Sequence, residues 1–172
     1  MNEKVVLVDL FGNKVGEMEK MEAHKKGKLH HAFSLFIIKD NKMLIQKRAK
    51  NKYHSGGLWS NACCSHPQMF ENIFKNIKNK TRQELGAEIL NLKYEFSFIY
   101  KNKFKNNLIE YEYDDVFSAE INSELNINKN EIECVKWLEL NILKKELENN
   151  SEKFTSWFLI CAPKIIEKYL NN

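Results

Sequence analysis

Residues 65–87 read SHPQMFENIFKNIKNKTRQELGA, and the apolar residues of this stretch recur with the period of a helix. Phe70, Ile73, Phe74 and Ile77 follow the three- and four-residue spacing that places side chains on one helical face. Leu85-Gly86 supplies a stop signal, because glycine readily adopts the left-handed conformation that ends helices. The pattern predicts a helix that begins near residue 70 and ends at residue 85.

The segments before and after this predicted helix read as strands separated by turns. Strands are expected over residues 4–10, 31–39, 42–48, 91–100, 108–121 and 131–138. Asp40-Asn41 predicts a hairpin turn, and the polar residues 49–58 predict a loop. Two helices are expected near 139–148 and 152–169, with Pro163 kinking or splitting the second. This order indicates a mixed α/β (α+β) fold whose sheet is largely non-sequential.

Length and composition favour one globular domain over residues 1–172, because no linker or repeat divides the chain. With 43% hydrophobic and 12% aromatic residues, the chain is too apolar to be disordered. Its apolar runs are too short to span a bilayer, and Asp9 interrupts the first of them. We therefore expect no membrane partner and no signal peptide.

The net charge of +4 is spread along the chain rather than gathered in a basic stripe. Proteins that bind nucleic acid usually cluster their basic residues, so we expect no nucleic-acid partner. The four cysteines, at positions 63, 64, 134 and 161, include no CxxC pair. This usage favours reduced thiols and a cytoplasmic location.

Glu110-Tyr111-Glu112 places two carboxylates on one face of a predicted strand, because alternate strand residues point to the same side. If that face is exposed, the two carboxylates are merely solvated. If it is buried, two like charges need a cation between them, and nearby histidines would make that cation a metal. The spacing alone leaves both alternatives open.

Cys64-Ser65-His66 has the same two-residue period if the segment is extended. A thiol and an imidazole would then face one cavity. The alternative is a structural thiol next to a surface histidine.

The spacing of residues 65–87 also resembles the Nudix box, G-x5-E-x7-R-E-U-x-E-E-x-G-U, in which U is an apolar residue. Glu71, Glu84 and Gly86 are kept, whereas the first glycine, the arginine and two glutamates are replaced by Ser65, Asn79, Lys80 and Gln83. A hydrolase uses the glutamate cluster to hold metal ions around a diphosphate and to activate water. The resemblance implies a single Nudix-like domain with an additional N-terminal strand and C-terminal helices, whose hydrolytic apparatus is dismantled.

Further motifs resemble type 1 isopentenyl-diphosphate Δ-isomerases and run in order through most of residues 5–165. They are Glu19-Lys20-x-x-Ala23-His24, Leu29-His30-x-Ala32-Phe33-Ser34, Lys47-Arg48-Ala49-x-x-Lys52, Trp59-Ser60-Asn61-Ala62-Cys63-Cys64-Ser65-His66-Pro67, Glu84-Leu85-Gly86, Tyr100, Glu110-Tyr111-Glu112 and Ser156-Trp157. The NACCSHP block followed by the later ExE pair is the most specific part of this resemblance.

The resemblance implies interconversion of isopentenyl and dimethylallyl diphosphate in isoprenoid biosynthesis, by proton transfer through a tertiary carbocation. It assigns proton transfer to Cys64 and Glu112, with Tyr100 beside Glu112. Trp157 would face the cation, although its helical spacing alone predicts a core residue. We expect cationic groups to poise the thiol and a metal to poise the carboxylate.

The resemblance also implies a five-ligand metal site, in which Mn²⁺, Mg²⁺ or Zn²⁺ would take expanded coordination. Its ligands would be His24, His30, His66, Glu110 and Glu112. Glu84 would hold a Mg²⁺ ion bound to the diphosphate. The phosphates themselves would be bound by Lys20, Arg48, Lys52 and Ser65.

The expected partner is a small prenyl diphosphate, and a monomer is favoured. Two other functions remain open from the sequence. A Nudix-type diphosphate hydrolase would share the fold, and a metal-stabilised binding module would keep the histidine and glutamate ligands without needing Cys64.

Overall fold

The computed structural model describes residues 3–171, and within them nine strands form one sheet accompanied by four α-helices. In chain order the elements are β1 (Lys4–Val8), β2 (Lys14–Glu19), α1 (Lys20–Lys26), β3 (His30–Lys39), β4 (Lys42–Arg48), β5 (Trp59–Ser60), β6 (Cys63–Ser65), α2 (Ile73–Leu85), β7 (Ile89–Lys103), β8 (Ile109–Ile121), β9 (Ile132–Glu139), α3 (Leu140–Asn149), a short 3-10 turn (Ser151–Lys153) and α4 (Ser156–Leu170). The predicted mixed α/β fold class is confirmed.

Strands β3 and β4 form a hairpin that stays paired only near its turn, at residues 37–39 of β3. Beyond that point residues 59–65 enter between the two strands, where β5 pairs with β4 and β6 pairs with β3. On its other edge β3 runs parallel to β8, which in turn pairs with β7 in a long antiparallel hairpin. This insertion places Cys64 directly across from Ser34, in the interior of the sheet.

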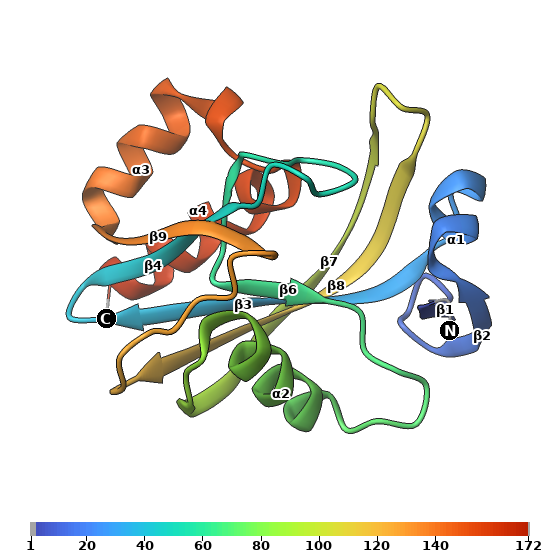
Figure 1. Cartoon of the computed structure of the whole chain (residues 1–172), viewed down its shortest axis with the longest axis horizontal. Helices are drawn as coiled ribbons and strands as arrows, with labels where there is room; N and C mark the ends of the chain where they lie inside the picture. Colours follow the sequence, from blue (N-terminus) through green and yellow to red (C-terminus); the bar gives the residue numbers. More distant parts are fainter. Residues whose placement is uncertain (1–2, 172) are drawn as a thin grey trace.

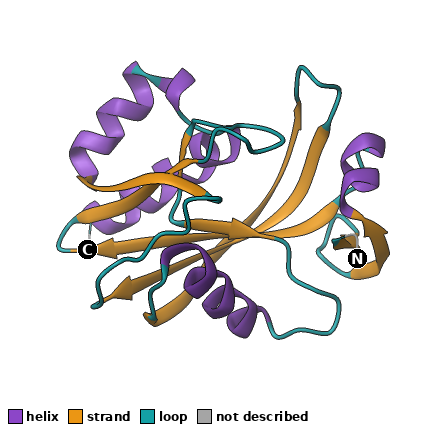
Figure 2. Cartoon of the chain, viewed as in Figure 1, coloured by secondary structure: helices purple, strands orange, loops and turns teal. Residues whose placement is uncertain are grey.

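The helices cover both faces of the sheet, with α3 and α4 on one side and α2 on the other (Figure 1). Strand residues alternate between the two cores as the pleat requires. Phe36 and Val116 pack with α3 and α4, whereas Leu35 and Phe117 pack with α2. Figure 2 shows the strands running through the centre of the molecule with the helices outside them. Burying a side chain of this size stabilises the fold by about 1.5–3 kcal/mol.

Several predicted elements are confirmed, including the hairpin turn at Asp40-Asn41. Both residues have positive φ, 48° and 61°, which is the backbone of the tight turn that matches strand twist. Helix α2 ends as predicted, since Gly86 follows it in the left-handed conformation. It begins at Ile73 rather than near residue 70, because the Asn72 side chain accepts a hydrogen bond from the backbone N–H of Lys75 and caps the helix.

Pro163 was predicted to kink or split this helix; α4 is continuous through Pro163, so the splitting alternative was wrong. Proline removes one backbone hydrogen bond and crowds the preceding turn. On both sides of it, however, Phe158, Cys161 and Ile165 are fully buried against the sheet. This packing outweighs the local cost of the proline.

The sequence patterns missed β2 and α1, which follow the first strand. β2 is largely exposed, so it lacks the apolar alternation that marks a strand. α1 spans seven residues, capped by the side chain of Glu19 at its start and by Gly27 at its end. None of the helices within residues 3–171 is long and apolar enough to cross a membrane.

Candidate active site

One cavity gathers nearly all the predicted site residues, which come from helices α1, α2 and α4, from strands β4, β6, β7 and β8, and from the loops after β4 and β6. The predicted residues that line it are Lys20, Arg48, Lys52, Cys64, Ser65, His66, Glu84, Tyr100, Glu110, Glu112 and Trp157. His24 and His30 are fully buried and lie against this cavity's His66 and Glu112. The acidic face of β8 is therefore buried, which removes the alternative that Glu110 and Glu112 are merely solvated.

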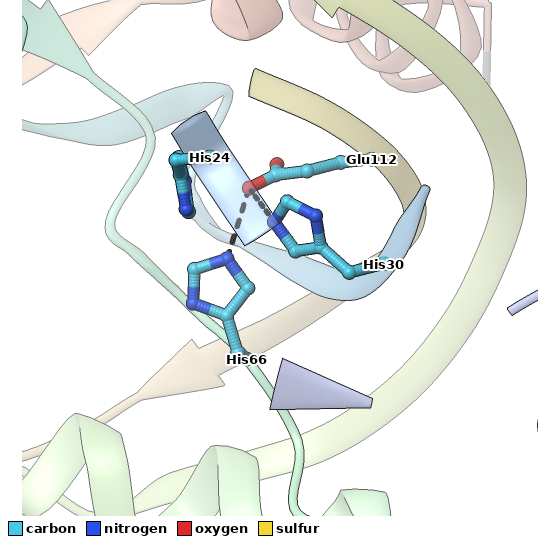
Figure 3. Close-up of side chains that lie close together, drawn as sticks. All are labelled: His24, His30, His66 and Glu112. Carbon is cyan, nitrogen blue, oxygen red and sulfur yellow. Dashed lines mark hydrogen bonds and ion pairs between the residues drawn. The ribbon is translucent and has the colours of Figure 1, made fainter. Parts of the chain in front are cut away.

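Glu112 is held from both neighbouring strands, because the register places His30 of β3 and Tyr100 of β7 directly opposite it. The Tyr100 hydroxyl donates to Glu112 Oε2 at 2.6 Å. His66 Nε2 lies 2.9 Å and His30 Nε2 lies 3.4 Å from Glu112 Oε1 (Figure 3). Burial opposes ionisation of Glu112, but the two histidines outweigh it and hold its pKa well below the usual value.

The imidazoles of His24 and His30 are oriented by backbone carbonyls, which fixes where their protons lie. Nδ1–H of His24 donates to the Lys20 carbonyl at 2.7 Å, and Nδ1–H of His30 donates to that of Lys28 at 2.8 Å. Their Nε2 atoms are thereby presented to the interior, where each is buried without a hydrogen-bond partner. Such carbonyl-bound imidazoles are the usual arrangement of metal-ligating histidines.

His24, His30, His66 and Glu112 each offer a ligand atom within 4.8 Å of the others, so this group could hold a metal ion (Figure 3). Burial lowers the pKa of His24 and of His66 to about 4, which keeps both imidazoles neutral. Neutral imidazoles and a carboxylate suit Mn²⁺ and Zn²⁺. The residues therefore fit the divalent metal that the sequence resemblance implies.

Glu110, the fifth predicted ligand, lies in an overlapping group with His24 and His54. Its Oε1 is 3.2 Å from His54 Nε2, and its Oε2 is buried without a hydrogen-bond partner. Burial and the neighbouring charge of Glu112 raise its pKa well above the usual value. Two carboxylates on one buried face are thus present, as the two-residue period predicts.

Cys64 and Trp157 form another part of the cavity wall, together with Arg48. Burial raises the pKa of the Cys64 thiol to about 12, although the Arg48 guanidinium, with Nη1 4.0 Å from Sγ, opposes the rise. The expectation that cations poise this thiol is therefore corrected, because the cost of burying the thiolate is larger. Trp157 is both core and cavity wall: it is 3% exposed, its Nε1 donates to Asn61 Oδ1 at 3.0 Å, and its ring lies 5.3 Å from Arg48.

The predicted phosphate-binding lysines already have carboxylate partners in this structure. Lys20 pairs with Glu3 at 3.1 Å, and Lys52 pairs with Glu131. Glu84, the predicted Mg²⁺ ligand, is 5% exposed and pairs with Lys80 at 3.1 Å. Burial raises the pKa of Glu84, and the Lys80 ammonium opposes that rise.

Comparison with known proteins identifies the family. Residues 28–158 match the NUDIX domain. A protein of Aromatoleum aromaticum named isopentenyl-diphosphate Delta-isomerase 2 is 40% identical over 167 residues, covering 96% of this chain and 88% of the relative. A Photorhabdus laumondii protein of the same name is 44% identical over 160 residues, covering 92% and 89%. The chain belongs to the isopentenyl-diphosphate Delta-isomerase family.

The fold of this Delta-isomerase family member also matches solved structures. A crystal structure from Deinococcus radiodurans superimposes with a TM-score of 0.76 at 15% sequence identity, covering 94% of this chain and 98% of that one. Within the family fold, the Nudix-box helix α2 contributes one carboxylate to the cavity, Glu84. Glu71 and Gln83 are exposed and do not line it.

Lys80, Asp114 and His54 are among the residues of this cavity that sequence reasoning overlooked. Lys80 lies one helical turn before Glu84, a spacing that predicts their ion pair. Asp114 continues the period of Glu110 and Glu112 on β8; it is 1% exposed and accepts from Ser34 Oγ at 2.8 Å. His54 sits in a polar loop, and no pattern in that loop distinguishes it from a surface histidine.

Proposed function

We propose that this protein interconverts isopentenyl diphosphate and dimethylallyl diphosphate, and that Cys64 and Glu112 carry the two proton transfers. The observation that carries the proposal is a half-buried thiol and a buried carboxylate that line one cavity and have opposite pKa shifts. At neutral pH the Cys64 thiol keeps its proton while the Glu112 carboxylate has lost its own. Pairs of groups whose surroundings separate their pKa values in this way are how active sites assign an acid and a base.

The reaction needs such a pair because an alkene is a weak base and its protonation creates a tertiary carbocation. Cys64 delivers a proton to C4 of isopentenyl diphosphate, and Glu112 removes a proton from C2. Tyr100 holds the Glu112 carboxylate through its hydroxyl. The face of Trp157 stabilises the cation, and a desolvated contact of this kind contributes about 2 kcal/mol.

A divalent ion, Mn²⁺, Mg²⁺ or Zn²⁺, held by His24, His30, His66, Glu110 and Glu112 would offset the repulsion between the two buried carboxylates. His24 and His30 are prepared for this role by their carbonyl-bound Nδ1 atoms.

Glu84 would be the carboxylate ligand of a Mg²⁺ ion bound to the diphosphate. The oxygens of the diphosphate are bound by Lys20, Arg48, Lys52 and Ser65. To bind them, Lys20 breaks its ion pair with Glu3, and Lys52 breaks its ion pair with Glu131. We place the reaction in the cytoplasm, carried out by a monomer, since a reducing compartment keeps Cys64 a free thiol.

The alternative is a Nudix-type diphosphate hydrolase, which the family fold would also support. Against it, Asn79, Lys80 and Gln83 stand where the Nudix box has an arginine and two glutamates, and Glu71 is exposed. One carboxylate on α2 does not form the cluster that binds several metals around a scissile diphosphate.

Product analysis decides between these functions. The purified protein is incubated with isopentenyl diphosphate, Mg²⁺ and Mn²⁺, with Glu112→Gln as the matched control. We expect dimethylallyl diphosphate from the wild type and none from the variant. Released phosphate would identify a hydrolase, and unchanged substrate that is nevertheless bound would identify a binding module.

A further inference from the structure

His54 is a buried histidine that the proposed mechanism does not use. It lies in the loop between β4 and β5 and is 7% exposed. Its ring is stacked on Phe104 at 4.6 Å and contacts Tyr53 edge-on at 4.3 Å, with Ser55 Oγ 3.2 Å from Nδ1. Three neighbours thus hold the ring in one orientation, with Nε2 directed at Glu110.

The loop that carries His54 is itself tightly folded. A Cβ atom at Gly56 would come within 2.5 Å of the Lys50 carbonyl oxygen, so this position admits only glycine without a shift of the backbone. The backbone N–H of Gly57 donates to the Arg48 carbonyl at 3.0 Å, and that of Arg48 donates to the Leu58 carbonyl at 2.9 Å. The chain therefore fixes the position of the imidazole as well as its orientation.

The contact between His54 and Glu110 repeats the spacing of the other histidine–carboxylate contacts in the cavity. His54 Nε2 lies 3.2 Å from Glu110 Oε1, compared with 2.9 and 3.4 Å for His66 and His30 against Glu112. Two adjacent ligands on one ion, each with a bond of about 2.1 Å, are about 3.0–3.4 Å apart. His54 is therefore placed as a ligand would be.

His24 connects this contact to the metal group already described. His24, His54 and Glu110 offer ligand atoms within 4.8 Å of one another, and His24 also belongs to the group with His30, His66 and Glu112. His24 Nε2 and Glu110 Oε2 are both buried without a hydrogen-bond partner, each leaving a lone pair uncompensated. His24 lies on α1 and Glu110 lies on β8, two elements far apart in the sequence. Each thus offers an atom with a free lone pair near the His54 side chain.

We propose that His54 is a ligand of the metal centre, acting with His24 and Glu110, so that this chain offers four imidazoles and two carboxylates. The inference rests on the proposed metal centre and adds a ligand to it. Six protein donors match the number that an octahedral ion takes. Four nitrogen donors among them favour a transition metal over Mg²⁺, which prefers oxygen ligands.

The test uses the metal-free protein with Zn²⁺ or Co²⁺ as the added ion and does not depend on activity. X-ray absorption of the Zn²⁺-loaded wild type counts the imidazoles on the metal, and we expect four, with three in His54→Ala. Co²⁺ titration against a competing chelator should show an affinity at least about tenfold lower for His54→Ala, since even residues behind the ligands change metal affinity about 10–100-fold. His31→Gln is the matched control, because His31 contacts Asp115 at 2.7 Å and neither residue belongs to the metal groups.

Three imidazoles in the wild type would overturn the proposal, and so would an affinity of His54→Ala equal to that of wild type. A weaker His54→Ala with the wild-type imidazole count would also overturn it, by making His54 a partner of Glu110 outside the ligand shell. The count in the wild type needs no variant, so poor folding of His54→Ala leaves the test intact. If His24→Ala and His30→Ala also bind metal normally, the metal centre itself is wrong; if they lose metal and His54→Ala does not, only this inference fails.

Discussion

Adjacent cysteines with opposite surroundings provide a sharp test of the proposed acid. Cys63 is fully buried in the core beneath α2, whereas Cys64 lines the cavity with Arg48 and Trp157. Their side chains point to opposite faces because they are neighbours on β6. We expect Cys64→Ala to abolish isomerisation with little loss of folding stability. We expect Cys63→Ala to lose folding stability but to keep its isomerase activity.

The magnitudes follow from the two environments. Removing a positioned general acid costs about 10²–10⁴-fold in rate, equivalent to about 3–5.5 kcal/mol of transition-state stabilisation. Truncating fully buried Cys63 removes one heavy atom and leaves a small cavity, which costs about 1–2 kcal/mol of folding free energy. For a chain of this size that lowers the melting temperature by roughly 2–4 °C per kcal/mol.

The assay measures kcat on isopentenyl diphosphate and thermal unfolding for both variants. Cys63→Ala should keep kcat within about threefold of wild type, well below the effect of losing an acid. Equal losses of activity in the two variants, with both folded, would refute the assignment of Cys64. So would a Cys64→Ala protein that turns over at a near-normal rate.

Three further predictions concern the metal, the proton path and pH. Alanine at His24, His30 or His66 should in each case reduce the amount of bound metal, measured by elemental analysis. Glu84→Gln should keep that metal but raise KM, because it weakens the Mg²⁺–diphosphate contact. Full metal content in all three histidine variants would contradict the proposed metal site. When the reaction runs in D₂O, mass spectrometry should find deuterium in the new methyl group of dimethylallyl diphosphate, because the C4 proton comes from an exchangeable group. Glu112→Gln should bind substrate without turnover. Unlabelled product would exclude the proposed proton transfers. As pH falls from about 6.5 towards 4, the metal-free wild type should lose more unfolding free energy than metal-free His24→Ala or His66→Ala. The reason is that buried His24 and His66, with pKa values lowered to about 4, resist protons that the unfolded chain takes up. The same pH dependence of the denaturation midpoint in wild type and both variants would count against their burial as neutral groups.

The local patterns of the sequence determined much of the fold, because they depend on neighbouring residues alone. The apolar period of residues 73–77 and the left-handed Gly86 specify α2, and the turn at Asp40-Asn41 specifies the β3–β4 hairpin. The two-residue period of Glu110 and Glu112 likewise predicts that these carboxylates share a face.

Whether that face is buried was decided only by the tertiary structure. Burial depends on which strands and helices pack against β8, and those partners come from distant parts of the chain. Register across β3, β7 and β8 places His30 and Tyr100 opposite Glu112, a pairing that no local pattern encodes. The same holds for the Cys64 thiol: the sequence led us to expect that cationic groups poise it, but burial dominates and raises its pKa.

His54 shows this division most clearly. In the sequence it is one polar residue in a loop, and its neighbours along the chain give no sign of burial. In the structure Phe104, from the end of the β7–β8 hairpin, covers its ring and turns Nε2 towards Glu110. The sequence by itself determines which chemical groups are neighbours along the chain. Desolvation and ligand geometry depend on contacts between residues far apart in the sequence, so only the tertiary structure determines them.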